Sequence, residues 1–372
     1  MTEAPEGDAI LDLPDGAVCR LDLSSQAPHR TIAEVQIGLD PEGAALDPAG
    51  RRAYATCARS NALSVVDLDA LETVGEIGVG EEPIDAVFDE ATGRVFVADM
   101  RSGTVSVVDT RRGERIAAIE VPPYPSGLAQ DPGRRRLYCG SAASTMTVID
   151  LDTLKKLGAV ECELGAGAIC VDTERNRVYC SNFLANSVTV VDGEDLTAVG
   201  RFEAGPAPCA MGISERAGHA YVVNSLADSL TRIDLETSEV LDEVKVGRAP
   251  VGLNVSPSGD RIYTGNRGAG TVSVVGTEDG VEWGRFPVGD GPAGCVVDPV
   301  TGHLVVSNAG SGSITVIEDL LTGPVPRPDP TDHPLVGRSL PPFALPELAS
   351  GRVRHSREWA DKLYILNFFA SW

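Results

Sequence analysis

The chain has 372 residues, a formal net charge of −23 and 42% hydrophobic residues, with 40 glycines and 25 prolines. This composition indicates a folded protein with many turns. The negative charge disfavours nucleic acid or an anionic membrane surface as a partner. No run of about 18 apolar residues occurs, so no transmembrane helix is predicted. The first residues carry no signal-peptide pattern, and we therefore expect a cytoplasmic protein.

The N-terminal part of the sequence contains three short strand signals. They are "AILDL" at residues 9–13, "AVCRLDL" at residues 17–23 and "TIAEVQIG" at residues 31–38. Each combines apolar and polar residues over a length typical of a strand. The second and third look like the last two strands of the repeat that follows, without a first strand of their own.

A repeat of about 42 residues fills most of the chain. Its anchor is an aromatic residue in the second strand of each unit, and successive anchors are 42 residues apart, with one interval of 41. The anchors are Tyr54, Phe96, Tyr138, Tyr179, Tyr221 and Tyr263, and Val305 closes the series. Every unit contains four strand signals separated by Gly, Asn, Asp or Pro. Four short strands at this period are typical of β-propeller blades.

The repeat predicts an all-β fold, a seven-bladed β-propeller with four-stranded blades. The last unit has three strands and then runs into prolines. We expect residues 31–38 to supply its fourth strand, because this closure removes the open edges of the sheets. Residues 9–13 leave an eight-bladed closure as an alternative. The first strands of the units end near Asp47, Asp89, Asp131, Asp172, Ser214, Ser256 and Asp298.

The second strands and the turns before the first strands carry a recognisable motif. The strands read "YCSN" (179–182), "YVVN" (221–224) and "YTGN" (263–266), and the turns read "VGRAPVG" (246–252) and "VGDGPAG" (288–294). The units resemble the YVTN family of β-propellers, which are YncE-like, over about residues 10–320. The resemblance implies a seven-bladed propeller and says little about function, because propellers host many activities.

Several recurring polar residues are interpreted as structural. A short polar side chain can bond nearby backbone in a turn, which accounts for Asn182, Asn224, Asn266, Asn308 and the strand-ending aspartates. His219 and His303 stand where other units have arginine, in the hairpin between the first and second strands. We therefore predict no metal site, no cofactor and no catalytic residue in this chain.

Departures from the repeat give better candidates for a binding site. Two residues after the turn proline, Asp85 is the single charge among small residues. Other polar residues fall in the loops that line the channel mouth of a propeller. We predict that they form a polar pocket for a small anionic or mixed-charge ligand, with an ordinary solvated rim as the alternative. The predicted binding residues are Asp85, Arg59, Arg101, Tyr124, Arg248 and Arg267.

The eight cysteines show no C-x-x-C or C-x-x-H spacing, so no zinc knuckle is predicted. In a cytoplasmic protein we expect them to be free thiols. Cys57 and Cys209 fall in predicted mouth loops. Cys139 and Cys180 occupy equivalent positions of adjacent units, and we interpret them as buried fillers.

The composition of the sequence changes after the repeats. Five prolines between Pro324 and Pro334 predict a stiff, extended linker. The pieces "VGRSLPPFALPEL" (336–348) and "SGRVRHSREWADKLYILNFFASW" (350–372) resemble the start of a redoxin or TlpA-like thioredoxin domain. In that family a C-x-x-C motif follows this point, so the resemblance implies a segment cut before its reactive cysteines. The predicted domains are 1–9 (tail), 10–320 (propeller), 321–334 (linker) and 335–372 (incomplete thioredoxin-like segment).

Three functional hypotheses follow. In the first, the propeller is a binding or docking module of a propeller–redoxin fusion, whose complete form would be a thiol–disulfide oxidoreductase. This chain alone would then be inactive in that reaction. In the second, the propeller is itself a small-molecule enzyme, similar to lactonases, lyases or dehydrogenase subunits. In the third, it is a protein-interaction scaffold. The expected partner is a protein client or a small ligand at the mouth, and we expect a monomer.

Overall fold

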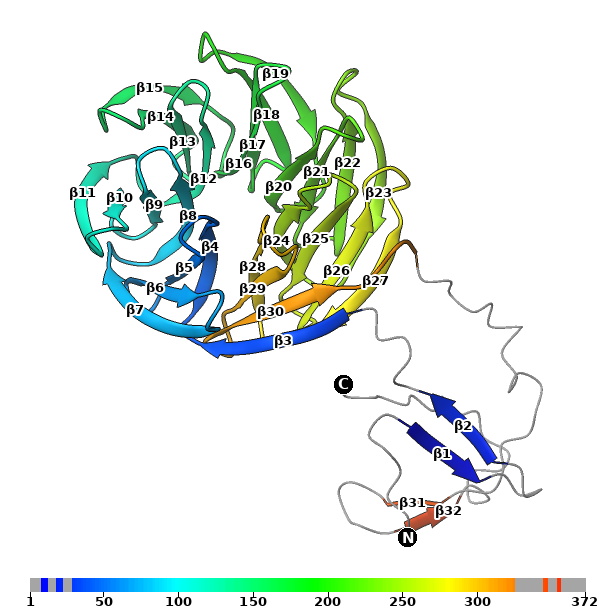
Figure 1. Ribbon diagram of the computed structural model, residues 1–372. Coiled ribbons are helices and arrows are strands. Elements are labelled where there is room, and N and C mark those ends of the chain that lie inside the picture. The colour runs from blue at the N-terminus through cyan, green and yellow to red at the C-terminus, as the bar shows by residue number, and fades with distance from the viewer. Residues whose placement is uncertain (1–7, 13–17, 23–28, 325–343, 347–352, 356–372) are drawn as a thin grey trace. The chain divides into compact units, whose positions relative to one another are not determined.

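The computed structural model describes residues 8–12, 18–22, 29–324, 344–346 and 353–355, and all regular elements in these ranges are strands. Seven antiparallel four-stranded sheets form the blades of a ring (Figure 1). Blades 1 to 6 are built from consecutive strands, β4–β7 through β24–β27. Blade 7 has the strand order β28-β29-β30-β3. The fold is therefore the predicted all-β, seven-bladed propeller.

The strands of blades 1 to 3 are β4 (Pro41–Asp47), β5 (Arg52–Cys57), β6 (Ala62–Asp67), β7 (Glu72–Gly78), β8 (Pro83–Asp89), β9 (Arg94–Asp99), β10 (Thr104–Asp109), β11 (Glu114–Glu120), β12 (Pro125–Asp131), β13 (Arg136–Ser141), β14 (Thr145–Asp150) and β15 (Lys156–Glu161). Those of blades 4 to 6 are β16 (Ala166–Asp172), β17 (Arg177–Asn182), β18 (Ser187–Asp192), β19 (Ala198–Glu203), β20 (Pro208–Ser214), β21 (His219–Asn224), β22 (Ser229–Asp234), β23 (Val240–Lys245), β24 (Pro250–Val255), β25 (Arg261–Asn266), β26 (Thr271–Gly276) and β27 (Glu282–Pro287). Blade 7 consists of β28 (Pro292–Val297), β29 (Leu304–Asn308), β30 (Ser313–Asp319) and β3 (His29–Gln36).

An N-terminal strand closes the ring, as predicted. β3 pairs with β30 from His29 opposite Asp319 to Gln36 opposite Ser313. The β28 strand of blade 7 contacts the β4 strand of blade 1 directly. The eight-bladed alternative is wrong, because the ring closes within residues 29–324.

Two short sheets lie outside the propeller unit of residues 28–324. β1 (Asp8–Asp12) pairs with β2 (Val18–Asp22), so residues 17–23 do not form a third strand of blade 7, where β30 already follows β29 in a hairpin. β31 (Ala344–Pro346) pairs with β32 (Val353–His355). The expected central strand at residues 364–372 lies outside the described residues.

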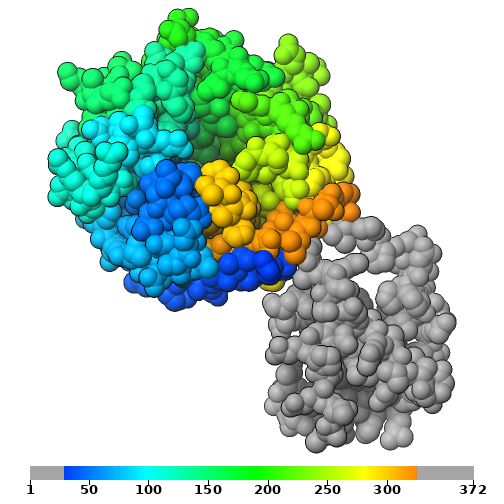
Figure 2. Space-filling view, in the orientation of Figure 1, coloured from blue at the N-terminus to red at the C-terminus, as the bar shows by residue number. Residues whose placement is uncertain are grey.

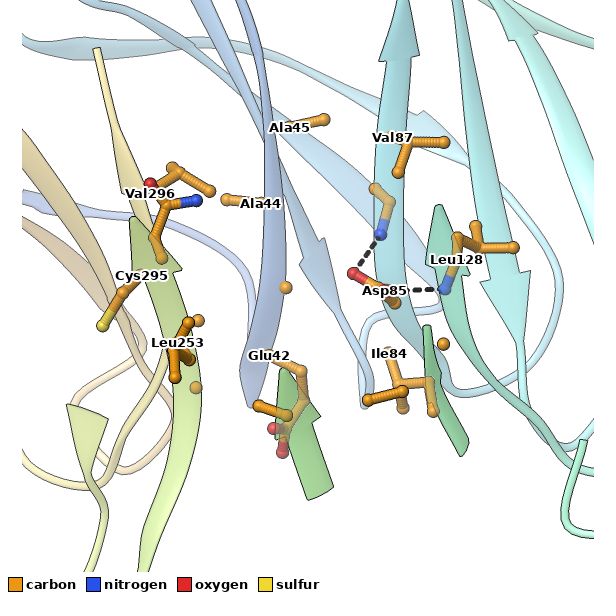
Figure 3. A pocket seen from close by; sticks show the side chains of 18 of the residues that line it. Glu42, Ala44, Ala45, Ile84, Asp85, Val87, Leu128, Leu253, Cys295 and Val296 are labelled. Atoms are coloured by element: carbon orange, nitrogen blue, oxygen red, sulfur yellow. Dashed lines mark hydrogen bonds between the residues drawn. The ribbon is translucent and has the colours of Figure 1, made fainter. Parts of the chain in front are cut away.

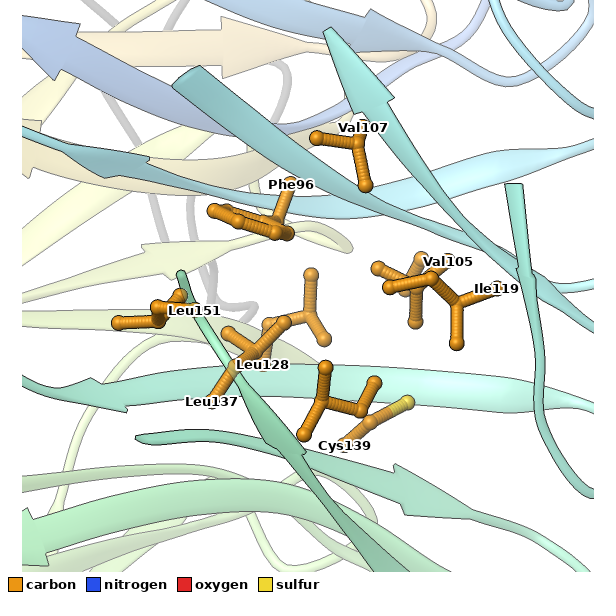
Figure 4. Close-up of a cluster of buried hydrophobic side chains, with 10 residues drawn as sticks. Phe96, Val105, Val107, Ile119, Leu128, Leu137, Cys139 and Leu151 are labelled. Atoms are coloured by element: carbon orange, nitrogen blue, oxygen red, sulfur yellow. The ribbon is translucent and has the colours of Figure 1, made fainter. Parts of the chain in front are cut away.

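The hydrophobic core is divided among the interfaces between neighbouring blades. In one cluster, Phe96 and Val107 of blade 2 meet Leu128, Leu137 and Cys139 of blade 3 (Figure 4). The anchor residues all lie in such interfaces with at most 4% of their surface exposed. Burying one large side chain contributes about 1.5–3 kcal/mol, so each interface stabilises both blades that form it.

The recurring asparagines hold the turn between the second and third strands. The Nδ2 of Asn266 donates to Thr271 Oγ1 (3.1 Å) and Ser273 Oγ (2.9 Å), and the other three asparagines repeat this pattern. A Cβ added to Gly247 would lie 2.4 Å from Asn266 Cγ. The glycine of the "VG" turn is therefore required because the asparagine side chain packs directly on it.

The strand-ending aspartates form turns, as expected. Asp67 Oδ1 accepts the backbone N–H groups of Asp69 (2.9 Å) and Ala70 (2.8 Å). On the same face of the ring, ion pairs connect blades. Arg51 binds Asp298 (2.8 Å) across the closure between blades 1 and 7, and Arg135 binds Asp89 (2.6 Å) between blades 3 and 2.

Removing β3 should destabilise the whole ring. A chain that begins at residue 37 loses the strand paired with β30 and buried Val35, which packs on Ile314 and Val316. We expect the free energy of unfolding to fall by more than about 3 kcal/mol, measured by urea denaturation, and self-association through the exposed edge of β30, measured by light scattering. A chain that begins at residue 28 is the control and should retain the stability of the full chain. Equal stability of the two truncations would contradict the role of β3.

Candidate functional site

The innermost strands of all seven blades surround a central cavity of about 780 Å³. Figure 2 shows the ring hollowed at its centre. Small residues recur near the mouth because neighbouring innermost strands approach closely there. A Cβ added to Gly252 would lie 1.9 Å from the carbonyl oxygen of Ala293, and one added to Gly127 would lie 2.5 Å from that of Gly167. These glycines therefore allow the ring to close tightly around the cavity.

Asp85 interrupts this ring of small residues, as predicted, and lines the cavity. Its Oδ1 accepts the N–H of Ala86 (2.9 Å), and its Oδ2 accepts the N–H of Leu128 (2.8 Å) on the next blade (Figure 3). Leu128 follows a bulge in β12, so the Asp85 carboxylate joins blades 2 and 3 next to a position where the pairing of β12 with β13 is irregular. Burial raises the pKa of Asp85 to about 6, although the two N–H donors oppose this shift.

Glu42 is a second carboxylate in the cavity wall, which the sequence interpretation missed. It stands one residue after the turn proline Pro41, and the equivalent residues of the other blades are all uncharged: Ile84, Ser126, Gly167, Cys209, Val251 and Ala293. Figure 3 shows it on β4, next to the strand that carries Asp85. The comparison that identified Asp85 would have found Glu42 if it had been made one position earlier.

Glu42 forms a bidentate ion pair with Arg267. The guanidinium donates to Oε1 (2.8 Å) and Oε2 (2.9 Å). Burial raises the pKa of Glu42, and the bond to Arg267 acts in the opposite direction. Because Arg267 belongs to blade 6 and Glu42 to blade 1, this pair spans blade 7 at the mouth.

The predicted arginines do not converge into one pocket. Arg59 and Arg267 line a pocket of about 380 Å³ together with Asp40, whereas Arg101 and Tyr124 line another of about 690 Å³. Asp85 lies in the central cavity. The Arg248 guanidinium donates to the carbonyl of Gly268 (2.8 Å).

Three of the four predicted arginines, Arg59, Arg101 and Arg267, are also paired with carboxylates. Arg59 lies 3.6 Å from Asp40, and Arg101 lies 3.1 Å from Glu82. These side chains therefore do not form a single pocket for an anionic ligand. The reason is that Arg59, Arg101 and Arg267 each bind a nearby acid, whereas Arg248 binds a backbone carbonyl.

The cysteines of the ring are free thiols in the structure. Cys139 and Cys180 are fully buried, as predicted. Cys57 is also buried, with its Sγ 3.3 Å from Ser64 Oγ, and Cys209 lines the central cavity.

The described residues contain no group of three or more His, Cys, Asp or Glu side chains arranged to hold a metal ion. In that same part of the chain, no helix is long and apolar enough to cross a membrane. His219 Nδ1 instead lies 3.2 Å from the carbonyl oxygen of Thr277, at the end of the blade away from the mouth.

Comparisons with known proteins agree with the fold. A family model described as a YNCE-like beta-propeller matches residues 138–261, which run from β13 of blade 3 to the start of β25 in blade 6. Among solved structures, a chain of Kuenenia stuttgartiensis hydrazine synthase is similar, with a TM-score of 0.69 and 17% identity. The match covers 74% of this chain and 95% of that chain. At this identity the likeness shows the propeller fold alone. No curated protein matches.

Replacing Asp85 with asparagine should change how stability depends on pH. The ordinary pKa is 3.8 and the pKa in the folded protein is about 6, so the folded state binds the proton more tightly than the unfolded chain. The free energy of unfolding should therefore fall as pH rises from about 4 to 6, by about 3 kcal/mol relative to Asp85→Asn. Urea denaturation at pH 4 and pH 7 measures this difference.

Asp67→Asn is the control of opposite sign. Backbone N–H groups of Ala70 and Asp69 lower the pKa of Asp67, so the wild type should gain stability relative to this variant as pH rises through the acid range. The same pH dependence in both variants would contradict the environment described for Asp85.

Proposed function

We propose that the propeller is a binding module that holds a small, positively charged ligand in the central cavity. The observation that carries this proposal is the charge of the lining. The charged residues among those that line the cavity are Glu42, Glu82 and Asp85, and all three are acidic. A cavity of about 780 Å³ has the size of small-molecule sites.

The two innermost carboxylates offer different kinds of contact. A carboxylate has about four lone-pair positions, and Asp85 uses two of them for Ala86 and Leu128. It therefore retains acceptor capacity for an ammonium or guanidinium group. Glu42 is compensated by Arg267, so it contributes a hydrogen-bond acceptor with less net charge. Partial burial strengthens both interactions, because the local dielectric is lower than in water.

The second part of the proposal concerns the chain beyond the propeller. We propose that it continues into a redoxin-like domain, and that the propeller presents a bound ligand or client to that domain. The β31–β32 hairpin, with Leu345 opposite Arg354, supports this proposal because the resembled family opens with two strands. The chemistry of such a domain would be thiol–disulfide exchange.

A second candidate is an enzymatic role for the same cavity. It is favoured by the pKa of Asp85, about 6, since a carboxyl group that titrates near neutral pH suits general acid–base catalysis. The two candidates differ in the fate of the ligand. Mass spectrometry after incubation would recover a merely bound ligand unchanged, whereas turnover would alter it.

Three ligands of similar size and different charge test the binding proposal. We expect benzylamine to raise the melting temperature at pH 7.5, and benzyl alcohol and benzoate to raise it much less. A ligand at about ten times its dissociation constant contributes about 1.4 kcal/mol, which corresponds to a few degrees. Differential scanning fluorimetry measures the shift. At pH 5 the benzylamine shift should be smaller, because Asp85 is then largely protonated.

Variants locate the site. Asp85→Asn and Glu42→Gln should each reduce the benzylamine shift, relative to their own ligand-free melting temperatures. Asp40→Asn is the matched control, because Asp40 lies in the neighbouring pocket beside Arg59 rather than in the central cavity. A larger shift with benzoate than with benzylamine, or equal shifts in all three variants, would reject the proposed site.

A further inference from the structure

Two cysteines lie together where blade 3 passes into blade 4. Cys162 follows β15 in the connection to β16, and Cys180 lies near the middle of β17. Cys180 is a fully buried member of the hydrophobic cluster between these blades, and the partly buried Cys162 packs against that cluster. Each thiol shifts the pKa of the other.

The repeat supports this proximity independently. The positions of Cys162 and Cys180 are occupied by apolar residues in most other blades. Wherever both are apolar, the two residues belong to the same interblade cluster, so the fold places these two positions near each other. The corresponding pairs are Ile37 with Ala55, Val79 with Val97, Val121 with Cys139, Ala204 with Val222, and Val288 with Val306.

The two thiols differ in exposure, because Cys180 is fully buried and Cys162 is partly exposed. The neighbouring Cys180 thiol lowers the pKa of Cys162, burial opposes this shift, and the Thr189 hydroxyl supports it. The neighbouring Cys162 thiol and complete burial raise the pKa of Cys180 well above its ordinary value. Since the thiolate is the nucleophile, the more exposed Cys162 is the thiol that reacts first.

We propose that Cys162 and Cys180 are a redox-active thiol pair, in which Cys162 attacks a low-molecular-weight disulfide and Cys180 resolves the product into an internal disulfide. This inference does not depend on the proposed ligand of the central cavity. The sulfur of Cys162 attacks the disulfide RSSR, forms a mixed disulfide and releases RS⁻, which takes up the proton that Cys162 has lost. Cys180 then loses its proton and attacks the Cys162 sulfur, which releases the second RS⁻. The protein loses two electrons and two protons, and RSSR becomes two RSH.

Glutathione disulfide is the probe for this reaction. The reduced full chain is incubated with it at pH 8, alkylated and digested with trypsin without reduction. Cleavage after Lys156, Arg175, Arg177 and Arg201 places Cys162 in peptide 157–175 and Cys180 in peptide 178–201. We expect these two peptides to become cross-linked, with Cys170 of the first peptide alkylated and no glutathione retained at Cys162.

Substitutions taken from other blades test the order of the steps. Cys180→Val introduces the residue found at Val97 and Val222, and should trap glutathione on Cys162. Cys162→Val introduces the residue found at Val79 and Val121, and should abolish the cross-link and leave Cys180 unmodified. Cys139→Val, one blade away, is the matched control and should leave the cross-link unchanged. Thermal unfolding checks that each variant remains folded.

Three results would overturn the proposal. The first is a wild-type protein whose Cys162 and Cys180 are both alkylated after incubation and denaturation. The second is glutathione that stays on wild-type Cys162, since Cys180 would then not resolve the mixed disulfide. The third is a cross-link that disappears in Cys139→Val while that variant remains folded.

Discussion

Burial between blades is the constraint on which the rest of this structure depends. A four-stranded blade has an apolar surface on both faces, and neither face can be covered within the blade itself. Phe96 of blade 2 is buried in a cluster with Leu137 of blade 3, and Tyr54 of blade 1 is buried in a cluster with Val97 of blade 2. A linear array would leave one face exposed at each end. Closing the ring removes both exposed faces, and the pairing of β3 with β30 holds the closure.

The same constraint determines the character of the central cavity. The innermost strands approach so closely at Gly127 and Gly252 that an added Cβ would meet the backbone of the next blade. A side chain at this position must therefore fit between two strands, and Asp85 does so by accepting the N–H of Leu128. The stabilising hydrogen bonds and the cost of burying the carboxylate oppose each other. A ring made tight by packing thus leaves few positions for charge, and the charges that it does admit dominate the cavity.

The sequence was sufficient to predict the fold because the repeat carries the same information seven times. The anchors Tyr54 to Val305 identify the register of each blade, and the missing fourth strand of the last unit required a strand from elsewhere. Asp85 was predictable for the same reason, as a residue that differs from its equivalents. The ion pair between Arg267 and Glu42 was not, because it joins blade 6 to blade 1. A period within the sequence indicates which positions are equivalent, but not which acid a long guanidinium side chain reaches.

The proximity of Cys162 and Cys180 was partly predictable from the sequence. Each residue is ordinary by itself, since both occupy positions where small apolar side chains pack in the other blades. Their significance comes from the repeat as a whole: Val79 packs in the cluster of Val97 and Val288 in that of Val306, so two cysteines at the equivalent positions also share one cluster. A departure from a repeat is usually sought one residue at a time. In a propeller, two departures at positions that the fold brings together carry more chemical meaning than either alone, because the packing of the core then places two thiols in one cluster.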